Sequence, residues 1–183
     1  MGQIPVAEAA AAAAGKVRVA GVTAESVVDG PGLRFVIFAQ GCPHRCPGCQ
    51  NPETWDPAGG TEIAVAELLE QIKANPLLKG ITLSGGEPFA QAAALACLAG
   101  AVRERGQDVV TYTGYTWERL MELARAYPEI ARLIEASDYI VDGPYVEAQR
   151  ELALPFRGSR NQRVLDVRAS LAAGKPVPAP WGN

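Results

Sequence analysis

The stretch LRFVIFAQGCPHRCPGCQN, residues 33–51, joins a predicted strand to a cysteine-rich loop. Residues 33–40 are rich in branched and aromatic side chains, which predicts a buried β-strand. Three cysteines then follow within eight positions, Cys42, Cys46 and Cys49. A chemically active loop directly after a strand is typical of α/β proteins, whose sites lie at the carboxyl ends of their strands.

The same succession of strand, loop and helix recurs along the chain. Strands are expected at residues 16–22, 33–40, 80–84, 108–112, 138–142 and 162–167, and helices at 61–74, through Cys97 to about Glu104, and at 116–127. From Gly80 onward the strands recur at intervals of roughly 30 residues, the size of a βαβ unit, which predicts a parallel sheet with covering helices. A closed eight-stranded barrel takes about 250 residues. The 183 residues therefore predict a partial, open (β/α) barrel or a doubly wound sheet.

Two of the expected helices carry further predictions. Thr61 is a plausible N-cap of the helix at 61–74, and Asn75-Pro76 ends that helix. The helix at 116–127 would turn Leu120, Leu123 and Tyr127 inward.

Four polar or glycine-rich loops follow strands of this predicted sheet. They are the cysteine loop, GGEP (85–88), TGY (113–115) and DGPY (142–145). Because the carboxyl ends of parallel strands share one edge, all four loops should meet at a single rim.

Composition and charge restrict the partners of this chain. The net charge of -3 offers no basic field for nucleic acid and no polybasic patch for a membrane. No apolar run approaches the length of a membrane span. The N-terminal stretch lacks the basic and leucine-rich regions of a signal peptide. Four cysteines without such a signal suggest a reducing compartment, so a cytoplasmic location is expected.

The chain is long enough for one domain, which we expect over residues 16–173. Residues 1–15 form an alanine-rich extension, and residues 174–183 form a proline-rich tail that should be extended or mobile.

The three clustered cysteines fit two kinds of metal site. A structural zinc site needs four tetrahedral ligands, usually from two C-x2-C-like pairs or Cys/His pairs. Only Cys46 and Cys49 have the C-x2-C spacing here. The only histidine, His44, is cramped between the cysteines, and Cys97 lies in an apolar helical run that favours a buried core position. An iron–sulfur cluster is usually held by four thiolates. Three thiolates would leave one iron open for a substrate.

The cysteine loop together with GGEP, about one βα unit later, resembles the radical S-adenosylmethionine enzymes. Many members carry an aromatic residue before the third cysteine, where this chain has Gly48. With Gly48 at that position, the cysteine loop resembles that of one branch of the family, the activating proteins of anaerobic (class III) ribonucleotide reductase. The resemblance covers residues 16–168 and rests on VDGPGLRFVIFAQGC (28–42), NPETWD (51–56), YTGYTWERL (112–120), VDGPYV (141–146) and LPFRGSRNQRVLDV (154–167).

The resemblance implies a set of site residues. Cys42, Cys46 and Cys49 would bind a [4Fe-4S] cluster, and the methionine part of S-adenosylmethionine would chelate its open iron. Residues implied to contact that cofactor are Gly48, Cys49, Gln50, Gly85, Gly86, Glu87, Pro88, Thr113, Gly114 and Asp142. Glu87 would accept from the methionyl ammonium, and no further catalytic residue is implied.

Several of these segments also have a purely structural interpretation. DGPG (29–32) can be a tight turn or can act directly near the active site, and RGSRNQ (157–162) can be a solvated loop, although its position before a late strand favours contact with the cofactor or partner. Asp142 can cap a turn, and Trp55 can pack over the cysteine loop.

The resemblance also implies a reaction and its partners. A reduced cluster would cleave S-adenosylmethionine to a 5′-deoxyadenosyl radical, which abstracts the Cα hydrogen of a glycine in a large glycyl-radical enzyme. The electron donor would be a flavodoxin, a ferredoxin or a thioredoxin-type reductant. Two alternatives stay open: a radical enzyme for a small metabolite or another glycyl-radical protein, and a non-catalytic zinc or iron–sulfur binding module.

Overall fold

The computed structural model describes residues 15–181, which form a mixed α/β fold around one seven-stranded sheet. The strand order is β3-β1-β2-β4-β5-β6-β7. The strands are β1 (Lys16–Ser26), β2 (Arg34–Ala39), β3 (Thr61–Ala64), β4 (Gly80–Gly85), β5 (Asp108–Tyr112), β6 (Tyr139–Asp142) and β7 (Arg163–Asp166). The helices are α2 (Val65–Lys73), α3 (Ala92–Glu104), α4 (Trp117–Ala126), α5 (Pro128–Ala136) and α6 (Val167–Ala173), with 3₁₀ turns η1 (Pro52–Thr54), η2 (Pro88–Gln91) and η3 (Glu147–Gln149).

The predicted parallel sheet is correct for the four central strands and wrong at both edges. Strands β2, β4, β5 and β6 are parallel, whereas β1 pairs antiparallel with β2 and β3, and β7 pairs antiparallel with β6. A parallel pair needs a crossover of a dozen or more residues, usually a helix. Only the segment 27–33 joins β1 to β2, so that pair is antiparallel.

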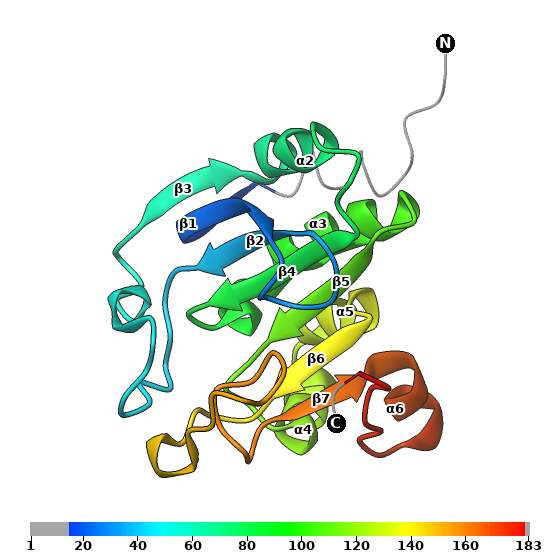
Figure 1. Ribbon diagram of the computed structural model, residues 1–183. Coiled ribbons are helices and arrows are strands. Elements are labelled where there is room, and N and C mark those ends of the chain that lie inside the picture. The colour runs from blue at the N-terminus through cyan, green and yellow to red at the C-terminus, as the bar shows by residue number, and fades with distance from the viewer. Residues whose placement is uncertain (1–14, 182–183) are drawn as a thin grey trace.

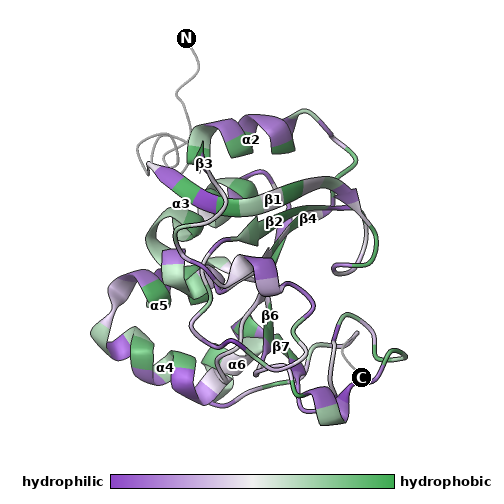
Figure 2. Cartoon of the chain, turned by 90° about the vertical axis from the view of Figure 1, so that its left-hand side faces the viewer, coloured by the Kyte–Doolittle hydropathy of each residue, from purple (hydrophilic) through white to green (hydrophobic). Residues whose placement is uncertain are grey.

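The helices cover one face of the sheet and bury the main core against it (Figures 1 and 2). Helix α3 packs on α2 and α5, and α4 packs on α5. Fully buried side chains join these helices to the sheet, among them Leu68, Ile72, Leu95, Leu98 and Leu133. Burial of one such side chain stabilises the fold by about 2 kcal/mol.

The predicted helix at 61–74 is wrong in its first turn. Residues 61–64 form β3, in which Thr61 pairs with Val19 and Ala64 pairs with Lys16. Helix α2 therefore begins at Val65, after Ala64 in an extended conformation, and Thr61 is not its N-cap. Residues 61–64 form a strand because they pair with β1, whose backbone N–H and C=O groups would otherwise lack partners on that side.

The predicted helix at 116–127 ends earlier than expected. Leu120 is fully buried as predicted and Leu123 is partly buried, but Tyr127 is 50% exposed. Pro128 follows Tyr127 and disfavours a helical conformation at that residue, so the chain is extended there and restarts as α5. The sequence reading missed α5 and also missed α6 beyond β7.

The carboxyl ends of the parallel strands lie on one side, as predicted. Figure 1 shows the loop after β2 in cyan and the loop after β6 in yellow and orange on the same left-hand side of the sheet. The turns after β4 and β5 lie between them in the strand order. The four loops singled out from the sequence therefore share one rim.

The described part of the tail after Gly174 packs against β7. Gly174 ends α6 with a positive φ of 66°. The Asp166 amide donates to the Val177 carbonyl at 2.9 Å, and the Ala179 amide donates to the Val164 carbonyl at 2.8 Å. Residues 1–14 of the alanine-rich extension lie outside the described residues. Over 15–181, every helix is too short or too polar to span a bilayer.

Candidate active site

A cavity of about 430 Å³ lies at the shared rim of the sheet. Its floor is a row of side chains at the ends of three neighbouring strands, Phe38, Ser84 and Tyr112. Phe38 is the register partner of Ser84, which places these side chains next to one another across β2 and β4. The cavity volume lies within the range of sites that bind small cofactors, about 300–1,000 Å³.

The cysteine loop forms one wall of this cavity. Cys42, Cys46 and Cys49 all line it, and each is partly exposed. The Cys42 amide donates to the Trp55 carbonyl at 3.2 Å, which attaches the loop to the segment after η1. The Cys49 amide donates to the Cys46 carbonyl at 3.1 Å and closes a turn between the second and third thiols. Backbone hydrogen bonds, within the loop and to Trp55, therefore help to order it.

The donor set fits a cluster with one open iron. The three thiols line one cavity and are partly exposed. A structural zinc site needs a fourth ligand besides these three, whereas a cluster with one open iron takes one thiolate at each of its other three irons. Cys97 is only partly buried on α3 and does not line the cavity, so its predicted place in the buried core is correct only in part.

Burial raises the pKa of the Cys42 thiol above its ordinary value, and the Glu87 charge raises it further. Backbone hydrogen bonds from His44 and Arg45 act in the opposite direction and lower this pKa. A thiolate, not a thiol, binds iron, so cluster binding must release the proton of Cys42.

The GGEP strip lies directly against the cysteine loop. The Gly86 amide donates to the Ala39 carbonyl at 2.7 Å, and the Glu87 amide donates to the Gly41 carbonyl at 2.9 Å. A Cβ on Gly86 would lie 2.4 Å from the Gly41 oxygen, and one on Gly85 would lie 2.6 Å from the Phe38 Cα. Only glycine allows this approach, and both glycines line the cavity.

Glu87 and Pro88 do not line the cavity, unlike the two glycines before them. The Glu87 side chain is fully buried and points toward the end of β5. Its carboxylate accepts from His44 Nε2 at 2.8 Å, from Thr113 Oγ1 at 3.0 Å and from the Gly114 amide at 3.0 Å. The Glu87 contact with a methionyl ammonium that the sequence analysis expected stays a prediction.

The remaining predicted site residues divide into two groups. Gln50, Thr113 and Gly114 line the cavity, whereas Gly48 and Asp142 do not. A Cβ on Gly48 would lie 2.7 Å from the Glu147 Cδ, which leaves the glycine beneath a flexible carboxylate.

The Asp142 carboxylate forms hydrogen bonds within the fold and does not line the cavity. It accepts from the Trp117 amide at 2.7 Å, at the first residue of α4, and from Arg163 Nε at 3.0 Å. The turn-capping interpretation of Asp142 agrees with these bonds. Its neighbour Gly143 lines the cavity, as does Gln162 before β7.

Sequence reasoning missed Tyr112 and Phe156 among the side chains of the cavity, whereas Arg157, which also lines it, belongs to the RGSRNQ loop singled out from the sequence. They lie inside segments that carried the family resemblance, YTGYTWERL and LPFRGSRNQ, which was the available signal. Burial raises the pKa of Tyr112, so its phenol stays protonated and donates to the Phe156 carbonyl at 2.9 Å. This bond ties the loop after η3 to the floor of the cavity.

The DGPG segment brings Asp29 to the cavity and is anchored by a buried arginine. Arg34 is fully buried, and its Nε donates to Thr82 Oγ1 at 2.7 Å. Thr82 Oγ1 in turn donates to the Asp29 carbonyl at 2.7 Å. Arg34 Nη1 also lies 2.6 Å from Asp108 Oδ1 as an ion pair. The segment is therefore a turn fixed by hydrogen bonds, and its Asp29 also lines the cavity.

Comparisons with known proteins agree with this geometry. The family model of a 4Fe-4S single cluster domain matches residues 28–165. The anaerobic ribonucleoside-triphosphate reductase-activating protein of Vibrio cholerae is 33% identical over 144 residues, which cover 74% of this chain and 89% of that protein. The protein of the same name from Escherichia coli is 34% identical over 150 residues, 78% of this chain and 94% of the relative. The pyruvate formate-lyase-activating enzyme of Clostridium pasteurianum is 35% identical over 114 residues, 59% of this chain and 48% of that enzyme.

Proposed function

Because the chain belongs to the family of anaerobic ribonucleoside-triphosphate reductase-activating proteins, we propose that it generates a glycyl radical on a large anaerobic ribonucleotide reductase subunit. The chain is a radical S-adenosylmethionine enzyme, with a [4Fe-4S] cluster and S-adenosylmethionine as its cofactors. The observation that carries the proposal is one cavity that joins all three thiols to Gly85 and Gly86.

We assign the cluster to Cys42, Cys46 and Cys49, and S-adenosylmethionine to the rest of the cavity. Held by these three thiolates and supplied with an electron from a donor, the cluster would provide the reductive cleavage of S-adenosylmethionine that serves to remove a hydrogen atom from the Cα of the substrate glycine. The protein orients the reacting atoms and excludes water. Gly85 and Gly86 expose backbone to the cofactor, while Phe38 and Tyr112 supply an apolar floor.

A macromolecular substrate suits the mouth of this cavity. Val27, Val28 and Leu152 are 68%, 74% and 79% exposed, and Val28 and Leu154 line the cavity itself. Apolar side chains left in solvent beside a reactive site favour a partner that covers them. A glycine-bearing loop of the reductase would complete the exclusion of water, which a small metabolite could not do.

The electron donor would approach from the other side of the cysteine loop. A second cavity of about 560 Å³ shares Cys42 with the first and is lined by Lys16, Arg18 and Arg45. Glu62 pairs with Lys16 and Arg18, which leaves a net positive wall. This charge suits an acidic electron carrier, such as an acidic flavodoxin or ferredoxin.

The donor assignment has a direct test. Arg45→Glu should slow reduction of the cluster by an acidic flavodoxin about tenfold, with less effect at high salt. Reduction by a small photochemical reductant should not change. If flavodoxin reduced wild type and Arg45→Glu at the same rate, the donor would bind elsewhere. Arg132→Glu on α5 makes the same charge change away from this cavity and is the control.

We also propose that the sheet is the partial, open (β/α) barrel expected from the resemblance, and that the protein works in the cytoplasm. The parallel central strands and the site at their carboxyl ends support the first proposal. The division into an extension, a domain at 16–173 and a tail stays a prediction.

The function is tested under anaerobic conditions with reconstituted protein. We expect 5′-deoxyadenosine formation that is lost in Cys46→Ala, together with a glycyl radical by EPR in an added reductase subunit. Cleavage without a radical in the reductase would favour another glycyl-radical protein or a small metabolite as the substrate. The match to a pyruvate formate-lyase-activating enzyme makes that lyase the second partner to test. No cleavage from a fully loaded cluster would contradict the activity.

A further inference from the structure

We propose that Glu87 is a positioning residue whose buried carboxylate holds His44, and through it the cysteine loop, in place for the cluster. This differs from an assignment of Glu87 as the direct acceptor of the cofactor's ammonium. The inference deepens the proposed function, because it concerns the same site, but its first test needs no cofactor.

The hydrogen-bonding capacity of the Glu87 carboxylate is fully used within the protein. A carboxylate offers about four lone-pair positions. Four groups donate to this one, and they are His44 Nε2, the Phe89 amide, Thr113 Oγ1 and the Gly114 amide. Their donor–acceptor distances are 2.8 Å for His44 and 3.0 Å for the other three. An ammonium would have to displace one of these donors at a side chain that is 0% exposed.

The Glu87 contacts bracket the first cysteine. Its backbone amide donates to the carbonyl of Gly41, the residue before Cys42. Its side chain accepts from His44, the second residue after Cys42. One residue thus fixes the chain on both sides of a cluster thiol, and Thr113 and Gly114 connect that residue to the end of β5.

The surroundings of His44 are shaped to keep the ring in this position. A Cβ on Gly114 would lie 2.3 Å from the His44 Cδ2, so glycine is required beside the ring. The Tyr115 ring packs edge-on against His44 at a centroid distance of 4.5 Å. Because an ionised carboxylate only accepts, His44 Nε2 carries the proton of the shared hydrogen bond. The His44 side chain is 17% exposed, so the bond is largely shielded from water.

The hydrogen bond between Glu87 and His44 predicts which substitutions should loosen the cysteine loop. Glu87→Gln replaces one acceptor oxygen by an NH₂ group. In either orientation that NH₂ faces a backbone amide that also donates, from Phe89 or from Gly114. His44→Gln keeps an N–H group near the position of Nε2, whereas His44→Leu fills similar space without a donor.

The first experiment uses the apo-protein labelled with ¹⁵N-histidine. His44 is the only histidine of the chain, so its Nε2–H group gives a single assignable signal. We expect a signal protected from water exchange in the wild type and in Glu147→Gln, a nearby carboxylate change that leaves His44 untouched. Glu87→Gln should lose it. A signal unchanged by Glu87→Gln would overturn the proposal, whatever the outcome for the proposed activity.

The second experiment measures how fast a chelator removes iron from the reconstituted cluster. Loss of an outer-shell partner typically costs about tenfold or more in metal affinity, so about tenfold faster iron loss is expected for His44→Leu and for Glu87→Gln. His44→Gln should stay near the wild type. The double variant Glu87→Gln/His44→Leu should be no worse than either single variant, because the two residues act as one unit.

Binding of S-adenosylmethionine then separates the two roles of Glu87. If Glu87 acts through His44, both Glu87→Gln and His44→Leu should weaken the cofactor-induced change of the cluster EPR signal. If Glu87→Gln alone weakens it and His44→Leu retains both cluster and signal, Glu87 contacts the ammonium directly and the positioning role is wrong.

Discussion

At the scale of single residues, the site depends on backbone contacts that admit no side chain. Gly86 lies so close to the cysteine loop that a Cβ would stand 2.4 Å from the Gly41 oxygen and 2.9 Å from its carbon. Both atoms belong to the backbone, so a rotamer change cannot relieve the contact. The close packing of the backbone therefore requires a glycine at this position of the GGEP strip.

Gly86→Ala should destabilise the apo-protein by about 1–3 kcal/mol, because it overpacks two joined backbone segments. Urea unfolding measures this change without any cofactor. The matched control is Gly21→Ala in β1, where an added Cβ meets nothing within 4 Å and φ is not positive. That control should be neutral or slightly stabilising. Equal stability of the two variants would contradict the close approach of the strip.

At the scale of elements, the start of α4 joins two strand ends. Asp142 at the end of β6 accepts from the Trp117 amide, and Thr116 Oγ1 accepts from the Arg119 amide at 3.3 Å. Arg163 from β7 links Asp142 to Glu118 on the first turn of α4. An N-terminal carboxylate is favourable at a helix start, so this cluster fixes α4 to the sheet edge.

The Glu118–Arg163 pair should give a small, pH-dependent contribution to stability. The Arg163 hydrogen bond lowers the pKa of Glu118 from its ordinary value of 4.5. A lowered folded-state pKa stabilises the fold above the ordinary value, and the contribution is lost as pH falls through the lowered one. Glu118→Gln should therefore cost at most about 0.5 kcal/mol near neutral pH, because the pair is largely exposed.

Urea unfolding at about pH 7 and about pH 3 measures this prediction. The difference between wild type and Glu118→Gln should shrink toward zero at the lower pH. A constant difference would show that the carboxylate acts by packing and not by charge. The control is Glu122→Gln. It removes a carboxylate one turn after Glu118 on α4, which accepts from Arg119 and not from Arg163.

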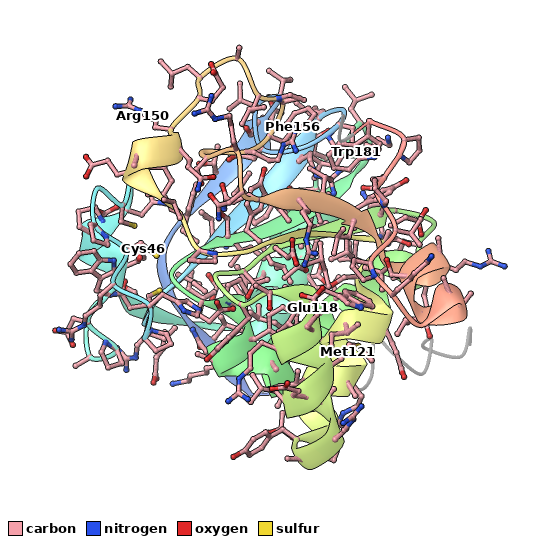
Figure 3. The ribbon with its side chains drawn as sticks, turned by 90° about the horizontal axis from the view of Figure 1, so that it is seen from below. Cys46, Glu118, Met121, Arg150, Phe156 and Trp181 are labelled. Atoms are coloured by element: carbon pink, nitrogen blue, oxygen red, sulfur yellow. The ribbon has the colours of Figure 1, made fainter. Side chains whose placement is uncertain are left out.

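At the scale of the whole molecule, the end of the chain supports the wall of the cavity. Trp181 packs edge-on against Phe156, which lines the cavity, and against Tyr139 of β6 (Figure 3). Phe156 has a positive φ of 55°, a conformation that costs energy for a residue with a side chain. The tail therefore helps to hold a strained loop beside the cavity.

Trp181→Ala should lower stability by about 2 kcal/mol and speed hydrogen exchange in residues 151–158. Trp181→Phe should be nearly neutral, because it keeps an aromatic contact and removes a buried indole N–H that has no partner among the described residues. Hydrogen exchange followed by mass spectrometry measures both variants. Unchanged exchange of the loop in Trp181→Ala would show that the tail does not support it.

Features that depend only on neighbours along the chain could be predicted from the amino-acid sequence. The three cysteines lie within one short loop, and GGEP lies one βα unit later, and this pattern carries the family resemblance that implies the cofactors. The central strands were also predictable, since each is a short apolar run bounded by loops. Their shared rim follows from parallel pairing.

The tertiary structure alone decided the features that join distant segments. Thr61 became a strand residue because β1 offered unpaired backbone groups to it. Asp142 became a cap of α4 because Arg163 and Trp117 meet it there. Glu87 and His44 are 43 residues apart, and only the fold reveals their hydrogen bond. The physical reason is the same each time: a polar group that becomes buried must find a partner, and the fold determines which partner is near.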